Sequence, residues 1–135
     1  MYEIKKTYKD FFGTERTEVF RFNLMKTELA EMELSKNGGF AERIQAIIDA
    51  KDDAKILAIF KDFVLNSYGE VSEDGKHFMK NDTIRNRFEC TQAYSDIFTE
   101  LAFDSEKAEK FINGIVPEDM RLTDDQIKQL ENNKQ

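Results

Sequence analysis

The segment YEIKKTYKDFFGTERTEVFRFNL, residues 2–24, decides the fold of the first part of the chain. Apolar residues alternate with polar ones before Gly13 and again after it, which is the pattern of strands with one buried face. Glycine adopts positive φ without steric cost, so Gly13 is the expected turn. Because a two-stranded hairpin alone is marginally stable in water, its apolar face must pack on the rest of the chain or on another copy of it. The alternating residues are Tyr2, Ile4 and Tyr8, then Phe20, Phe22 and Leu24.

Beyond the hairpin, the spacing of apolar residues becomes helical. The clearest example is a segment whose apolar residues fall at i, i+4, i+7 and i+8, which places them on one helix face. About five helices are expected between residues 26 and 116. Expected starts and ends include a stop at Asn37-Gly38-Gly39, caps at Asp52 or Asp53 and at Asn81 or Asp82, and a start at Ser105. The residues with the clearest helical spacing are Phe40, Ile44, Ile47 and Ile48.

The composition becomes mostly polar after Pro117. Thr123 and Gln126 form a capping-box pattern, which predicts a marginal terminal helix in a tail that is otherwise flexible and can order on a partner. The predicted fold is therefore α+β and mainly α-helical, with a hairpin packed on a bundle of about five helices. The predicted domain is residues 1–117, with the hairpin at 1–24 and the helices at 26–116, and residues 118–135 are the predicted tail.

The composition restricts the function classes. The chain has 135 residues and a formal net charge of −7. An acidic chain without a basic run gains little from phosphate attraction, which argues against a nucleic-acid partner. A single cysteine, Cys90, excludes an internal disulfide and fits a reducing compartment. With no long apolar run and no signal-peptide pattern at the start, we expect a cytosolic protein without a membrane partner.

The segment YGEVSEDGKHF, residues 68–78, contains acidic residues and His77, the one histidine of the chain. If Gly75 held the invariant glycine position of an EF-hand loop, Glu70 would be a poor first ligand and Asn81 could not replace the bidentate glutamate. His77 has no second histidine for a zinc site, and no catalytic sequence motif is present. Asp-Gly is a strong turn signal, so we interpret this segment as a turn closed by Val71 and Phe78. We expect no metal, cofactor or catalytic residue.

Taken in order, four segments of the chain resemble the tail assembly chaperones of long-tailed phages that infect Gram-positive bacteria. One feature departs from the family pattern, which has Ser or Thr after FNL. Met25 stands there and cannot cap a helix, so the first helix is expected to begin at Lys26 or Thr27. The four segments are FRFNL, ELAEMEL, DDAKILAIFKDFVLNSYGEVSEDGKHF and AYSDIFTELAFDSEKAEKFINGIVP.

The resemblance implies a non-enzymatic assembly factor. Members of this family look like proteins that bind the tape measure protein, keep it soluble and help recruit tail tube subunits. The family is commonly made in two lengths, the longer by a translational frameshift. The implied partners are thus the tape measure protein, the tail tube protein, further copies of the chain and a longer frameshifted product. The implied location is the host cytoplasm, with no place in the mature virion.

A chaperone of this kind needs exposed apolar surface on a charged exterior. The alternation at Phe20 and Phe22 is more typical of a core than of a partner surface. Phe11 and Phe12 flank the turn, where either exposure or burial fits the pattern. The candidate partner-binding residues are Phe11, Phe12, Phe20, Phe22, Met25 and Met32.

Two other functions stay open at this point. One is an acidic helical adaptor or regulatory domain that binds a host protein. The other is a small enzyme that uses His77 with Asp74 or Glu70.

Overall fold

The first two strands form a long antiparallel hairpin at the N-terminal end of the computed structural model, which describes residues 1–35, 38–49, 53–121 and 123–133. β1 (Tyr2–Lys9) pairs with β2 (Glu15–Phe22) along their whole length, from Tyr2 opposite Phe22 to Lys9 opposite Glu15. Gly13 has a φ of 81° at the turn. The hairpin and its pivot are therefore confirmed.

Two short strands extend the hairpin into a four-stranded antiparallel sheet with the order β1-β2-β3-β4. β3 (Tyr68–Val71) pairs with the end of β2 through Arg21 and Phe22, and β4 (Phe78–Met79) pairs with β3. Val71 lies opposite Phe78, which confirms the predicted turn. The pairing of β3 with β2 involves two residues of each strand and was not predicted, because nothing local in the sequence signals it.

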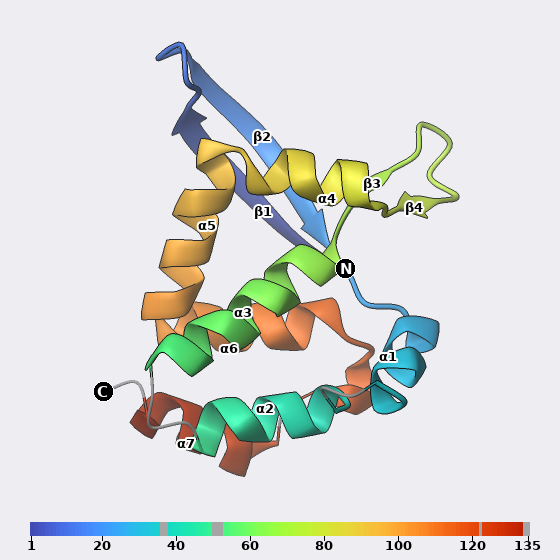
Figure 1. Ribbon diagram of the computed structural model, residues 1–135, viewed down its shortest axis with the longest axis vertical. Helices are drawn as coiled ribbons and strands as arrows, with labels where there is room; N and C mark the ends of the chain where they lie inside the picture. The colour runs from blue at the N-terminus through green and yellow to red at the C-terminus, as the bar shows by residue number, and fades with distance from the viewer. Residues whose placement is uncertain (36–37, 50–52, 122, 134–135) are drawn as a thin grey trace.

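Seven α-helices lie in the described part of the chain, so the α+β and mainly α-helical class is confirmed. Figure 1 shows the helices gathered on one side of the hairpin, whose turn points away from them. The helices are α1 (Lys26–Glu33), α2 (Phe40–Asp49), α3 (Asp53–Ser67), α4 (Asp82–Glu89), α5 (Gln92–Phe103), α6 (Ser105–Ile115) and α7 (Asp124–Asn133), with a 3-10 turn η1 at Glu118–Met120.

Polar side chains cap several helices as their types require. The Asn81 side chain accepts from the Ile84 amide at 2.8 Å and begins α4. Thr91 does the same for Tyr94 at 3.0 Å, which makes α5 a separate helix rather than an extension of α4. Asp104 caps α6, which begins at Ser105 as expected.

Of the boundaries predicted for the first three helices, the structure describes the start of α1 but not the residues Asn37 and Asp52. α1 begins at Lys26, one of the two predicted starts, and the Met25 amide donates to Glu28 Oε1 at 3.0 Å in place of a side-chain cap. Asn37 and Asp52 lie outside the described residues, so the predictions at these two positions have no outcome here.

The terminal helix predicted from the capping box is present as α7. The Thr123 amide donates to Gln126 Oε1 at 3.0 Å, and the Gln126 amide donates to Thr123 Oγ1 at 3.2 Å. α7 contacts α2 and α6. The flexibility of residues 118–135 and the division of the chain at residue 117 stay predictions.

An aromatic cluster joins the base of the hairpin to the helices. The Phe22 ring lies 5.7 Å from Tyr68, 5.9 Å from Phe88 in α4 and 5.4 Å from Phe111 in α6, measured between centroids. Tyr68 and Phe88 stack at 3.9 Å. Aromatic pairs at such distances add stability beyond the area they bury. The base of the hairpin is therefore packed into the core, and its turn projects away from the helices.

Candidate partner-binding surface on the hairpin

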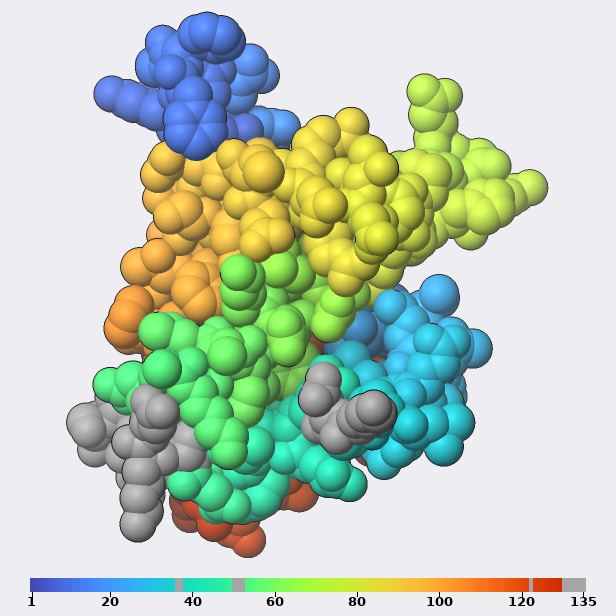
Figure 2. All heavy atoms as spheres, viewed as in Figure 1, coloured from blue at the N-terminus to red at the C-terminus, as the bar shows by residue number. Residues whose placement is uncertain are grey.

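The turn of the hairpin exposes two adjacent phenylalanines. Phe11 is 78% exposed and Phe12 is 97% exposed. Figure 2 shows this end of the hairpin, in dark blue, standing clear of the rest of the molecule. Adjacent phenylalanines this exposed, far from the core, leave a large apolar area in water, which is typical of a binding surface.

Asp10 orders the turn that carries these two side chains. Its carboxylate accepts from the Phe12 amide at 2.9 Å, from the Thr14 amide at 3.0 Å and from Arg16 Nε at 2.7 Å. The hydrogen bond from Arg16 is the main reason why the pKa of Asp10 lies below its ordinary value. The turn is thus built by its own polar groups, and Phe11 and Phe12 are not needed to hold it.

The structure does not bring the six candidate residues together. Phe20 and Phe22 lie in the core at the hairpin base, and Met32 is buried on the inner face of α1. Met25 is 49% exposed and precedes α1. Of the six, Phe11, Phe12 and Met25 are accessible to a partner in this conformation. The part that any of them plays in binding stays a prediction.

The two faces of the hairpin differ in chemistry. On the outer face, Arg21 Nε is 3.8 Å from Glu3 Oε2, Lys9 lies opposite Glu15, and the hydroxyls of Thr7 and Thr17 are 2.8 Å apart. Those residues of β1 are exposed. The inner face is partly apolar and packs against α5 and α6. Apart from Val19, the outer face is polar. The exposed apolar surface of this hairpin, called the arm below, is therefore concentrated at its turn.

Two apolar side chains outside the six candidates are also strongly exposed. Leu34, just after α1, is 91% exposed, and Phe103, the last residue of α5, is 76% exposed. Neither lies on the buried face of its helix, because Leu34 is two positions from Met32 and Phe103 is two positions from Leu101, which turns each side chain away from that face. Phe103 offers a control for Phe11 and Phe12 because it is a phenylalanine of similar exposure at a distant place on the chain.

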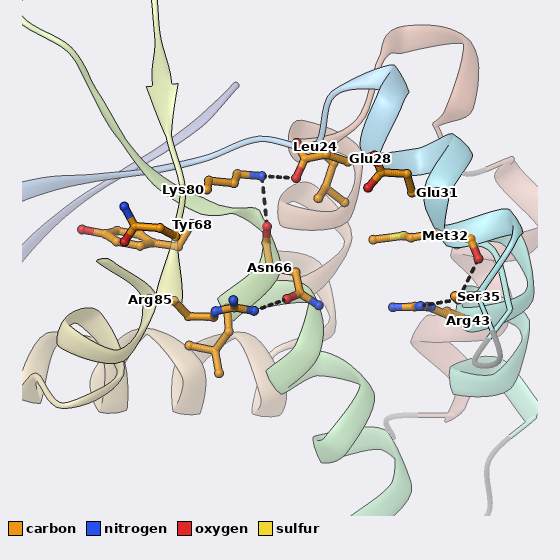
Figure 3. Close-up of a pocket in the computed structure, with 12 residues that line it drawn as sticks. Leu24, Glu28, Glu31, Met32, Ser35, Arg43, Asn66, Tyr68, Lys80 and Arg85 are labelled. Atoms are coloured by element: carbon orange, nitrogen blue, oxygen red, sulfur yellow. Dashed lines mark hydrogen bonds and ion pairs between the residues drawn. The ribbon is translucent and has the colours of Figure 1, made fainter. Parts of the chain in front are cut away.

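A cavity of about 370 Å³ lies between α1 and the junction of β4 with α4. In Figure 3, Tyr68, Lys80 and Arg85 line one side of it, and Met32 and Arg43 line the other. Lys80 Nζ lies 2.6 Å from Asn23 O, 2.6 Å from Glu28 Oε2 and 3.0 Å from Asn66 O. These contacts use all three N–H groups of the ammonium. Lys80 therefore fastens α1 to the sheet and has no donor left for a ligand.

Burial and pairing act in opposite directions on Lys80. Desolvation lowers its pKa below the ordinary value, and the hydrogen bond from Lys80 to Glu28 opposes this shift. A lysine with such fixed partners is more typical of a structural tie than of a catalytic group.

The segment around His77 is a solvent-exposed turn. The Ser72 amide donates to His77 O at 2.9 Å, and Asp74 Oδ1 accepts from Ser72 Oγ at 2.6 Å and from the Lys76 amide at 3.0 Å. Gly75 has a φ of 75°. His77 Nδ1 is 3.9 Å from Asp74 Oδ1, and the histidine side chain is 72% exposed. The interpretation of this segment as a turn is confirmed.

Within the described residues, no group of histidine, cysteine and acidic side chains has the arrangement of a metal site. In the same part of the chain, no helix has the length and apolar character needed to cross a membrane.

The comparison with protein families decides the class of protein. A family model described as phage tail assembly chaperone matches residues 1–135, the whole chain. The chain belongs to the phage tail assembly chaperone family. No curated protein and no solved structure matches it. Membership of this family supports a chaperone role with phage tail proteins as partners.

Proposed function

We propose that this tail assembly chaperone binds the tape measure protein of its phage, keeps it soluble and helps recruit tail tube subunits. The observation that carries the proposal is the pair of exposed side chains, Phe11 and Phe12, on an ordered arm of a chain that belongs to this family.

The arm suits an apolar partner. Phe11 and Phe12 each offer an aromatic ring, and a phenylalanine that becomes buried removes roughly 150–250 Å² from water. The turn is held by Asp10, so little conformational freedom is lost when the two rings are covered. The net charge of −7 keeps complexes apart from one another. We infer that the rings insert between apolar side chains of the tape measure protein.

The proposal has further parts, drawn from the resemblance to the same family. The phage is a long-tailed phage of Gram-positive bacteria, and the chaperone acts without catalysis in the host cytoplasm and is absent from the mature virion. It associates with further copies of itself and with a longer product of translational frameshifting.

The direct test is co-expression with the tape measure protein of the same phage. The double variant Phe11→Ser/Phe12→Ser is expected to lower the amount of soluble, co-purified tape measure protein by about tenfold or more, because both apolar anchors are lost. Phe103→Ser is the matched control and is expected to change nothing. Unaltered recovery with the double variant would move the binding surface away from the arm.

A pull-down of the unaltered chaperone from phage-producing cells tests the identity of the partner. Recovery of the tape measure and tube proteins supports the proposal. Recovery of a host protein alone, in stoichiometric amount, would contradict it and favour the adaptor function.

A further inference from the structure

β1 is an edge strand of the sheet, and half of its residues direct their backbone N–H and C=O groups away from β2. In an antiparallel pair, successive residues point their N–H and C=O groups alternately toward the neighbouring strand and away from it. The Asp10 amide, just after β1, donates to Thr14 O at 2.9 Å across the turn, so the even-numbered residues of β1 direct their N–H and C=O groups toward β2. The odd-numbered residues therefore direct their N–H and C=O groups outward, and these are Glu3, Lys5, Thr7 and Lys9.

The other side of the hairpin agrees with this assignment. By the same alternation, the odd-numbered residues of β2 direct their N–H and C=O groups away from β1 and toward β3. Asn23, the odd-numbered residue just after β2, does the same, because its amide donates to Ser67 O at 2.8 Å next to β3. In the described part of the chain, β1 has no backbone hydrogen bond other than those to β2. Its outward groups thus form a free strand edge of eight residues without proline.

A free edge of this kind is a template for a further strand. α5 packs over the inner face of β1, where Glu100 pairs with Lys6. Lysines on an edge commonly prevent association, and β1 carries three of them. Whether they do so here depends on what each lysine would face in a second strand.

Two copies of β1 can pair antiparallel with Lys6 of one copy opposite Lys6 of the other, and this register around Lys6 sets opposite charges against each other. In that register Glu3 lies opposite Lys9 of the second copy, and Lys9 lies opposite its Glu3, both on the outer face. Ile4 lies opposite Tyr8 and Lys5 lies opposite Thr7. The two Lys6 side chains meet at the centre, each already paired with Glu100 of its own chain. Opposite charges directly across a strand pair are favourable.

The neighbouring registers are less favourable. Pairing around Lys5 sets two unpaired lysines against each other, and like charges directly opposite destabilise a sheet. Pairing around Thr7 sets Lys5 against Lys9 of the second copy. Pairing around Ile4 brings Glu3 opposite Lys5 but shortens the shared strand to residues 2–6. The register around Lys6 is the one that combines opposite charges at both ends with a long overlap, residues 3–9; pairing around Lys5 overlaps over residues 2–8 but opposes two lysines.

We propose that two copies of the chain associate through antiparallel pairing of their β1 strands, with Glu3 of each copy opposite Lys9 of the other. This inference specifies the surface for the self-association in the proposed function. The partner is recognised by backbone hydrogen bonds from the outward groups and by two ion pairs. The two turns, with Phe11 and Phe12, would then project from opposite ends of one continuous sheet.

Charge reversal tests the register in the purified full chain, without any phage partner. Glu3→Lys places lysine opposite lysine at both ends, and Lys9→Glu places glutamate opposite glutamate. Each variant alone is expected to weaken the dimer by about tenfold or more in sedimentation equilibrium. An equal mixture of the two variants is expected to recover the association that each variant alone loses, because across the two β1 strands every reversed residue then faces the opposite charge; the like charges opposite Arg21 and Glu15 within each hairpin are the same in the mixture as in the single variants.

Lys5 supplies two controls. Lys5→Glu is expected to have little effect, because Lys5 faces Thr7 in this register; strong weakening would indicate the pairing around Ile4 instead. Lys5→Pro removes an outward N–H and keeps the hydrogen bonds to β2, so it is expected to abolish the dimer with the fold intact by circular dichroism.

Besides strong weakening by Lys5→Glu, three results would overturn the proposal. They are a strict monomer at the highest attainable concentration, a mixture of the charge variants that stays monomeric, and open-ended filaments instead of a closed dimer. Because the chain is measured alone, failure here leaves the binding of the tape measure protein to be decided by its own experiment.

Discussion

The base and the turn of the hairpin each carry two phenylalanines, but those at the base are buried and those at the turn are exposed. At the base, Phe20 and Phe22 are buried against aromatic rings of α4, β3 and α6. At the turn, Phe11 and Phe12 are exposed, and polar groups around Asp10 hold the backbone. Residue type alone therefore does not decide whether a phenylalanine stabilises the fold. That depends on whether a packed surface lies within its reach.

The largest expected effect is the loss of the Phe22 ring. Phe22→Ala leaves a cavity among Tyr68, Phe88 and Phe111, and the free energy of unfolding is expected to fall by about 3–5 kcal/mol. Phe12→Ala is the matched control and is expected to stay within about 0.5 kcal/mol of the unaltered chain. Urea unfolding followed by circular dichroism measures both. Equal losses would mean that the turn is packed against something in solution.

The part of the fold that could be predicted is the part encoded locally. The hairpin, the Gly13 turn, the buried face of α2 and the cap at Asn81 each depend on residues a few positions apart. The burial of Phe20 and Phe22 follows from alternation along one strand. For Phe11 and Phe12 the sequence left exposure and burial equally open, since the two residues sit in a turn where no alternation exists.

What could not be predicted depends on residues far apart in the chain. Lys80 reads as an ordinary charged residue before a helix, yet it contacts Asn23 and Glu28, more than fifty positions away. The pairing of β2 with β3 likewise rests on two residues of each strand. A single sequence contains no local signal for such contacts.

The second largest expected effect is the loss of the contacts that Lys80 makes with Asn23, Glu28 and Asn66 near the base of the hairpin. Lys80→Met leaves the Asn23 and Asn66 carbonyls without this donor and Glu28 without its cation, and is expected to lower the free energy of unfolding by about 1–3 kcal/mol. The double variant Lys80→Met/Glu28→Gln is expected to lose less, because no half-buried carboxylate is then left unpaired and the glutamine keeps an oxygen for the Met25 amide. Lys76→Met, in the exposed turn, is the control. Urea unfolding of the three variants checks this, and a double variant weaker than the single one would contradict it.

The third effect separates two tyrosines whose pKa values are both raised to about 12, Tyr68 at the base and Tyr8 nearer the turn. Burial is the main cause for Tyr68, and the hydrogen bond to Glu18 is the main cause for Tyr8. Because the folded pKa exceeds the ordinary value of about 10, each contribution is complete below pH ~10 and is lost as the pH rises toward ~12.

Only the contribution of Tyr68 is expected to be measurable. After allowance for its partial exposure, it amounts to about 1 kcal/mol between pH ~10 and ~12. Tyr68→Phe should flatten the alkaline fall in unfolding free energy by that amount, and Tyr8→Phe should change it less, since the hydrogen bond between the Tyr8 hydroxyl and Glu18 is exposed to screening solvent. A larger change with Tyr8→Phe would contradict the distinction between base and turn.

The smallest expected effect is local to the turn and appears in acid. The pKa of Asp10 is lowered by Arg16 and by the Thr14 and Phe12 amides, so its contribution is present above the ordinary carboxyl value of about 3.9 and is lost as the pH falls through the lower folded value. The amide signals of Phe12 and Thr14 should therefore shift below that ordinary value, with the base unchanged. Asp10→Asn keeps an oxygen for both amides and should remove the titration. If those amides instead moved together with the aromatic cluster, the turn would not be the independent unit that its hydrogen bonds describe, and the exposure of Phe11 and Phe12 would depend on the core after all.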